Sequence, residues 1–282
     1  MLRLCFLFLN LPLGKRMIQP VLKSLAVAML GVSTLAAHAA DANVTNNVIM
    51  GTGITNGGFT VGTGNNIEIG LRGRERHAIG SDLPTNVTGS NNNGSYNQNF
   101  GEPAGFIAAG QNRARWNFDW SINTDKGGTG NAKVSAYTYL LSMDFDPGVG
   151  TNYQTFDLIN AQTFFDHSFG NNGTAQSAGT LASGAGSGAG QYQALKQGNN
   201  LVQNSWNYDF FDAGAFSGFN PNAQGTYTIK LEAFSLAGGG LLASSLINVN
   251  VGAAAVPEPG SMALVGLGLG ALAIMRRRKA KV

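Results

Sequence analysis

Cysteine is nearly absent from this 282-residue chain, whose single thiol is Cys5. The chain can form no internal disulfide, and the region after residue 40 has no thiolate to act as a nucleophile or a metal ligand. Charge is also scarce, because Asp, Glu, Lys and Arg make up 12% of the residues. Residues 41–255 hold nine basic and fourteen acidic side chains, a net charge of about −5, which argues against a general nucleic-acid-binding protein.

The apolar run near the N-terminus is too short to form an ordinary membrane-spanning helix. It covers residues 25–35 and follows a lysine, and the small residues Ala37 and Ala39 come after it. A basic start, a short apolar stretch and a small-x-small site are the three parts of a secretory signal peptide. We therefore expect residues 1–40 to be a signal peptide that signal peptidase removes, with Met17 as an alternative start of translation.

A second short apolar segment lies near the C-terminus, at residues 262–275. As a helix, these 14 residues would extend about 21 Å, less than the ~30 Å hydrocarbon core of a bilayer. The segment is flanked by a Pro-Glu-Pro motif and an arginine cluster: Pro257, Glu258, Pro259, Arg276, Arg277 and Arg278. Because basic residues stay on the cytoplasmic side, we expect a short transmembrane helix that enters the inner membrane transiently.

The order of motif, short helix and basic tail in residues 256–282 resembles the PEP-CTERM sorting signal. The resemblance implies that an exosortase recognises and processes the chain during export through the inner membrane. It further implies a mature protein of the cell envelope, the cell surface or the extracellular space. A simple single-pass tail anchor is the alternative.

Between the two signals, residues 41–255 show no sustained 3.6-residue periodicity, and period-2 runs of strand formers occur instead. Trp116, Phe118, Trp120 and Ile122, for example, alternate with polar residues and so share one face of a strand. Four further segments have the pattern of strands: residues 66–76, 132–145, 226–236 and 241–251. The last two are joined through three glycines and predict a hairpin.

Evenly spaced strands with Gly- and Asn-rich loops predict an all-β fold, an antiparallel β-sandwich of the immunoglobulin-like or jelly-roll-like kind. Two segments are too rich in Gly, Asn and Ser to bury much apolar surface, and we expect long loops at residues 80–112 and 170–200. Segments such as WNFDWSINTD and GTYTIKLEAF resemble a passenger domain that recurs among PEP-CTERM proteins, over about residues 67–251. That resemblance implies a single exported domain and assigns no catalytic or binding residue.

Asp144 and Asp146 are the candidate metal ligands. On one strand they share a face, and clustered carboxylates are the ligands that calcium prefers. Asp146 is followed by Pro147 and Gly148, a sequence typical of a turn in which Asp accepts backbone hydrogen bonds. The turn is the favoured interpretation. Calcium is the alternative and the one cofactor that the sequence suggests.

Arg72, Arg74 and Arg76 alternate along the predicted strand at residues 66–76 and therefore point to one face. The favoured interpretation is a solvated edge strand whose charges prevent aggregation. The alternative is a positive ridge that contacts a polyanion, such as an acidic polysaccharide.

Catalysis has weak support, because no G-x-S-x-G or S-x-x-K motif accompanies the two histidines of residues 41–255. A Ser-His-Asp set built from His167 with Asp157 or Asp166 is a minor alternative. We therefore expect no catalytic residues and a non-catalytic surface or matrix protein, with the link to exopolysaccharide and biofilm that its resemblance to PEP-CTERM proteins implies. The alternatives are a carbohydrate- or calcium-binding module of the matrix and, third, an envelope hydrolase.

Overall fold

The structure is a computed structural model, and its described part lies in the second of two compact units, His38–Val282. The described residues are 41–45, 56–76, 87–98, 114–160, 166–184, 188–207, 211, 220, 223–236 and 239–252. The predicted signal peptide and the predicted C-terminal helix lie outside these ranges.

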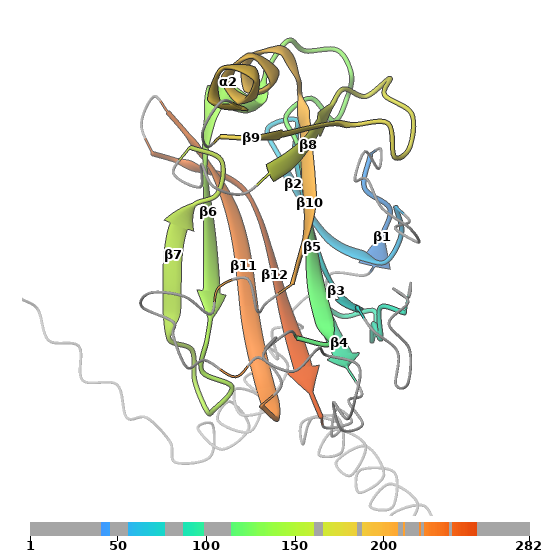
Figure 1. Ribbon diagram of the computed structural model, residues 1–282, viewed down its shortest axis with the longest axis vertical. Coiled ribbons are helices and arrows are strands. Elements are labelled where there is room, and N and C mark those ends of the chain that lie inside the picture. Colours follow the sequence, from blue (N-terminus) through green and yellow to red (C-terminus); the bar gives the residue numbers. More distant parts are fainter. Residues whose placement is uncertain are drawn as a thin grey trace, which may run out of the picture. The chain divides into compact units, whose positions relative to one another are not determined.

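Two β-sheets make up the described part of the unit (Figure 1). The first has seven strands in the order β1 (Asp41–Ala42), β2 (Phe59–Gly64), β3 (Ile67–Glu75), β5 (Trp116–Asn123), β10 (Leu201–Asn207), β8 (Asp166–Gly170) and β9 (Thr180–Ser183). The second has five, in the order β4 (Ser95–Gln98), β12 (Leu241–Val251), β11 (Gly225–Ser235), β6 (Tyr137–Asp144) and β7 (Tyr153–Asp157). The predicted all-β, antiparallel arrangement is confirmed, except that β4 pairs with β12 in parallel.

The core lies between the two sheets and is rich in aromatic side chains. Trp116, Phe118, Trp120 and Ile122 of β5 are fully buried, so the face predicted from their alternation is correct. Across the core, the ring of Trp116 lies 5.4 Å from that of Tyr227 on β11, measured between centroids. Large rings in such tilted and edge-on contacts supply much of the apolar burial that stabilises a sandwich.

Along one side the two sheets approach so closely that glycine is required. A Cβ atom on Gly62 of β2 would lie 1.7 Å from the carbonyl oxygen of Ser244 on β12. The hydroxyl of Ser245 donates a hydrogen bond of 2.7 Å to the carbonyl oxygen of Thr60, which joins the sheets directly. The sandwich is therefore nearly closed along the β2–β12 side.

The predicted hairpin is confirmed, because β11 and β12 pair as consecutive antiparallel strands. The expectation of long loops is wrong in part, because residues 80–112 contain β4 and residues 170–200 contain β9 and the helix α2 (Ala189–Gly198). Figure 1 shows α2 at the top of the view, at one end of the strands. Tyr192 is the buried residue of this helix, which explains why no apolar stripe marked it in the sequence.

Candidate functional sites

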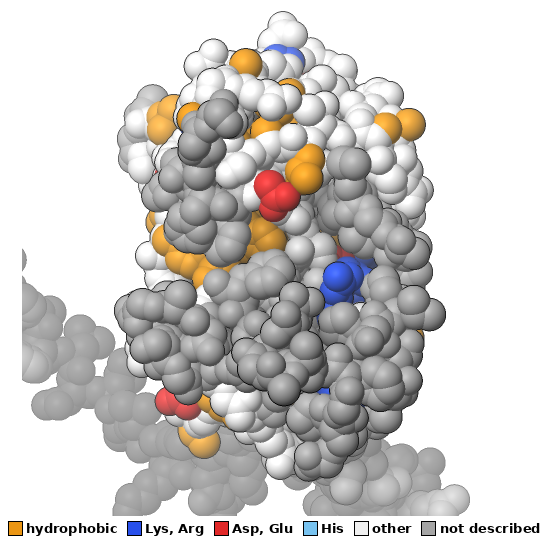
Figure 2. Space-filling model, viewed as in Figure 1, with side chains coloured by type: hydrophobic (Ala, Val, Ile, Leu, Met, Phe, Trp, Pro, Cys, Tyr) orange, Lys and Arg blue, Asp and Glu red, His pale blue; other side chains and the backbone are white. Residues whose placement is uncertain are grey.

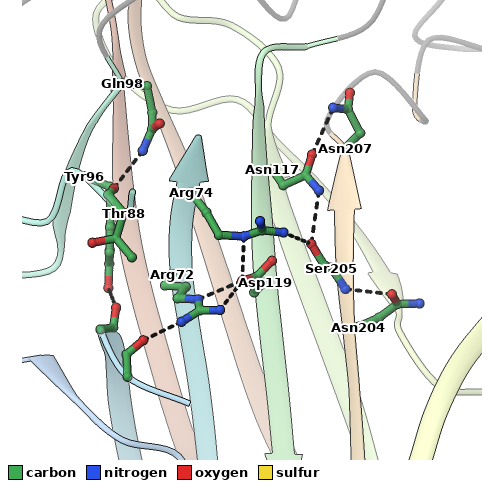
Figure 3. A network of polar contacts seen from close by, with 12 residues as sticks. Arg72, Arg74, Thr88, Tyr96, Gln98, Asn117, Asp119, Asn204, Ser205 and Asn207 are labelled. Carbon is green, nitrogen blue, oxygen red and sulfur yellow. Dashed lines mark hydrogen bonds and ion pairs between the residues drawn. The ribbon is translucent and has the colours of Figure 1, made fainter. Parts of the chain in front are cut away.

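A cluster of charged side chains joins the neighbouring strands β3 and β5 (Figure 3). Nε and Nη2 of Arg72 each lie 2.7 Å from Oδ2 of Asp119, and Nε of Arg74 lies 3.2 Å from the same oxygen. All three side chains are at most 1% exposed. One carboxylate is therefore shared by two guanidinium groups inside the protein.

Polar and aromatic neighbours also contact the two arginines. Nη1 of Arg72 donates to the carbonyl oxygen of Gly57, and its guanidinium lies 4.3 Å from the ring centroid of Phe59. Nη2 of Arg74 donates to the hydroxyl oxygen of Ser205 on β10 at 3.0 Å. Figure 3 shows these side chains converging from three adjacent strands, so the network ties β3, β5 and β10 together.

The surrounding charges decide the ionisation of Asp119. Burial by itself raises the pKa of a carboxyl group, but the guanidinium groups of Arg72 and Arg74 outweigh it and lower the pKa of Asp119. The carboxylate therefore stays ionised and compensates one of the two buried positive charges.

The interpretation of the arginine stripe as a solvated edge strand is wrong. β3 lies between β2 and β5, and Arg72 and Arg74 are buried, whereas Arg76 follows the end of the strand and is partly exposed. The period-2 pattern assigned the two buried arginines to one face correctly, but it contains no information about what covers that face. A polyanion contact through Arg72 and Arg74 would require this packing to open.

Asp144 and Asp146 accept the backbone hydrogen bonds of a turn. Oδ1 of Asp144 accepts from the amides of Asp146 and Asn152, both at 3.1 Å, and Oδ1 of Asp146 accepts from Gly148 at 2.9 Å. These are the bonds that the turn interpretation predicts. Within the described ranges, no group of three or more His, Cys, Asp or Glu side chains is placed to hold a metal ion.

His167, the histidine considered for a catalytic set, lies in the aromatic core. Its Nδ1 lies 2.9 Å from the hydroxyl of Tyr192, and its ring centroid lies 5.1 Å from that of Trp120. Burial lowers the pKa of His167 to about 3. The imidazole is therefore neutral at physiological pH and contacts a phenol rather than the carboxylate of Asp157 or Asp166.

The sequence patterns gave no sign of a polar surface on the outer side of the five-stranded sheet. Alternation along the strands places Tyr227, Ile229 and Leu231 in the core and turns their neighbours outward. We define the five-strand polar face by eight outward, part-exposed or exposed residues: Asn97, Thr155, Thr226, Lys230, Glu232, Ser244, Asn248 and Asn250.

Cross-strand hydrogen bonds order the side chains of this face. Thr226 donates its hydroxyl to Oδ1 of Asn250 at 2.9 Å, and Nδ2 of Asn250 donates to Oδ1 of Asn97 at 2.9 Å. Lys230 forms an ion pair of 2.9 Å with Glu232. The result is a row of amide and hydroxyl groups across β11, β12 and β4, next to a compensated charge pair.

The sorting and cleavage residues predicted from the sequence lie outside the described ranges: Ala37, Ala39, Pro257, Glu258, Pro259, Arg276, Arg277 and Arg278. In the part of the chain that is described, no helix is both long and apolar enough to cross a membrane.

Comparison with known proteins gives one match. Residues 255–279 match the family model of the PEP-CTERM protein-sorting motif. The match covers the predicted Pro-Glu-Pro motif, the apolar segment and the arginine cluster, so it supports the resemblance drawn from those residues. No curated protein and no solved structure matches the chain.

Proposed function

We propose that this PEP-CTERM protein, which is exported and processed by an exosortase, is a non-catalytic component of the cell surface or extracellular matrix that binds exopolysaccharide. The sorting motif supports delivery to the cell envelope or surface. Polysaccharide binding is supported by the ordered row of Thr226, Asn250 and Asn97 on the five-strand polar face.

The chemistry of that row suits a polyhydroxyl ligand. Each asparagine amide has two N–H donors and two acceptor lone pairs, and each sugar hydroxyl is both donor and acceptor. The hydrogen bonds among Thr226, Asn250 and Asn97 use part of this capacity and leave the rest for a ligand. Because the side chains are already held on paired strands, little conformational entropy is lost when a sugar binds.

Apolar groups beside the row add contacts for the C–H faces of a sugar ring. Leu246 is 45% exposed and lies opposite Lys230 on the neighbouring strand. Nζ of Lys230 lies 5.7 Å from the ring centroid of Tyr153 on β7. The Lys230–Glu232 pair leaves this area close to neutral, which favours a neutral or weakly acidic polysaccharide.

Figure 2 shows the character of another part of the domain surface, the end that carries α2. Around α2 and the upper strands the view is mostly white, which marks backbone and uncharged polar side chains, and few charged groups appear. Such a surface offers hydrogen bonds without the strong field that would recruit nucleic acid.

The binding proposal is tested with the double variant Asn248→Val, Asn250→Val. Valine suits a strand but cannot form the amide's hydrogen bonds, so we expect affinity for the host's exopolysaccharide to fall at least about tenfold in titration calorimetry. Thr180→Val, at an exposed position on β9 of the other sheet, is the matched control and should bind like wild type. Equal affinity for the double variant and wild type would refute the assignment of this face.

A further inference from the structure

The start of the described domain contains an acceptor motif for N-linked glycans. Residues 43–45 read Asn-Val-Thr, and Asp41 stands two positions before the asparagine. This is the longer motif, Asp/Glu-x-Asn-x-Ser/Thr, of bacterial oligosaccharyltransferases. We infer that Asn43 is an N-glycosylation site, modified with a glycan from a polyprenyl-diphosphate carrier during export. The inference depends on export and is independent of polysaccharide binding.

The local structure leaves room for a glycan at Asn43. Asp41 and Ala42 pair with β2, and Val44 is 2% exposed and packs over Gly70 of β3. Alternation along this extended segment turns Asn43 outward, where it is exposed. Within the described ranges its side-chain amide has no hydrogen-bond partner. A bulky substituent on Nδ2 therefore removes no hydrogen bond that the described residues make.

Asn172, in the motif Asn-Gly-Thr, differs from Asn43 because its side-chain amide is hydrogen-bonded. Its Nδ2 donates to the carbonyl oxygen of Asp125 at 2.6 Å, and its Oδ1 accepts from Asn123 at 2.8 Å and from Asn200 at 2.9 Å. A glycan on this nitrogen would remove a donor proton and force apart the loops that the amide joins. A domain folded with these contacts therefore cannot carry a glycan on Asn172.

Asn93, in the motif Asn-Gly-Ser, is exposed, so accessibility does not separate it from Asn43. The residue two positions before it is Asn91, which has no negative charge. The same is true of the motif at Asn86, which is preceded by Pro84 and lies outside the described ranges. Of the four motifs in the sequence, the one at Asn43 alone has the acidic residue.

The contacts of Thr45 determine when transfer occurs. In the folded domain its hydroxyl donates to Oε2 of Glu68 at 2.9 Å, and its backbone amide donates to Oε1 at 2.7 Å. A transferase must engage this hydroxyl, so transfer precedes the docking of residues 41–45 onto the sheet. This is feasible because the motif directly follows the predicted cleavage site and emerges early during export.

The reaction is a substitution at the anomeric carbon of the donor glycan. Nδ2 of Asn43 forms a bond to C1, the bond between C1 and the diphosphate oxygen breaks, and polyprenyl diphosphate leaves. The amide proton that Asn43 loses passes to a base of the transferase. No oxidant or reductant is required.

Peptide mass spectrometry on the full chain, produced in its own host, tests the inference. The first tryptic site after the predicted cleavage is Arg72, so one peptide contains Asn43 without the other motifs. We expect a glycan mass on Asn43 that is lost in Asn43→Gln and in Asp41→Asn. It should remain in Thr45→Ser and in the matched control Asn93→Gln.

An unmodified Asn43 in protein from the native host would overturn the inference, as would a glycan on Asn93 or Asn172 with Asn43 bare. Full modification of Asp41→Asn would overturn the assignment of a role to the acidic residue. Because no described residue forms a hydrogen bond with the exposed Asn43 side chain, Asn43→Gln should also melt within about 1 °C of unmodified wild type.

Discussion

The hydroxyl of Tyr192 determines which tautomer of His167 is present. It donates to the carbonyl oxygen of Ile159 at 2.7 Å, so it must accept at 2.9 Å from a proton on Nδ1 of His167. The pKa of His167 is lowered to about 3 by burial, from 6.5 in the unfolded chain. The unfolded chain therefore binds a proton in a pH range in which the folded domain does not.

The contribution of neutral His167 to the free energy of unfolding is fully present above about pH 6.5. This contribution falls as the pH drops toward about 3. The slope from this residue is at most about 1.4 kcal/mol per pH unit. His167→Phe keeps a ring and removes the titration, so its unfolding free energy should fall less steeply than that of wild type. Urea unfolding between pH 7.5 and pH 4.5 measures both slopes. Tyr192→Phe keeps the histidine and should retain the steep slope, and parallel curves for wild type and His167→Phe would contradict the assignment.

The charge cluster on β3 and β5 predicts a large effect for Asp119→Asn. Removing the negative charge that Arg72 and Arg74 share breaks a buried ion pair, which typically costs about 3–5 kcal/mol. Asp166→Asn, at an exposed position on β8, is the matched control and should change stability by less than about 0.5 kcal/mol. Denaturant titration of both variants gives the comparison, and similar midpoints would show that the cluster contributes little.

The sequence predicts the apolar faces of the strands better than it predicts which charged side chains are buried. Alternation identified the apolar, core-facing side of β5 and the β11–β12 hairpin, because a pleated strand has a period of two and glycines mark a tight turn. It could not show that Arg72 and Arg74 are covered, since their partner Asp119 is 45 or more residues away in the chain. Burial of a charge depends on long-range packing that local patterns do not contain.

The candidate sites could likewise be predicted only where the interacting residues are close in sequence. Asp146 was recognisable as a turn residue because its partner amide, Gly148, is two positions away. The five-strand polar face was missed because Asn97 and Asn250 are brought together by a parallel pairing over 153 positions. Each of its strands looks unremarkable alone, and the row of amides exists only after the sheet has formed.

Replacement of glycine by alanine should have opposite effects on stability at Gly62 and at Gly190. Gly62→Ala places a Cβ 1.7 Å from the carbonyl oxygen of Ser244, so β2 and β12 must separate, and we expect a loss of several kcal/mol. Gly190→Ala lies in α2, where no described atom beyond the neighbouring residues and the helix backbone is within 4 Å of the new Cβ, and it should stabilise the domain by about 0.5–1 kcal/mol. Thermal melts of the two variants provide the measurement. A Gly62→Ala variant that melts like wild type would mean that the sheets are farther apart than described.

The hydrogen bonds of Asp146 predict whether calcium changes the melting temperature of the domain. If the carboxylate serves the turn, Asp146→Asn keeps the acceptor for Gly148 and should melt within about 2 °C of wild type, with or without millimolar calcium. A calcium site would instead raise the melting temperature with ion concentration, and Asp146→Asn would weaken that rise. Melts of both proteins over a calcium series distinguish the two cases. We expect the turn result, and a calcium-dependent shift in wild type would contradict it.

The predicted signal peptide and the sorting motif together predict the two ends of the mature chain. We expect signal peptidase to remove residues 1–40 and the exosortase to remove the tail beyond about Pro259, because the short apolar segment and the arginine cluster form a processing signal rather than a permanent anchor. Intact-mass measurement on protein from the native host gives both ends at once. The double variant Pro257→Ala, Pro259→Ala should retain Arg276, Arg277 and Arg278 in most molecules, whereas Ser261→Ala, just outside the Pro-Glu-Pro motif, should be processed like wild type. If most wild-type molecules kept the arginine cluster, the segment would be a tail anchor.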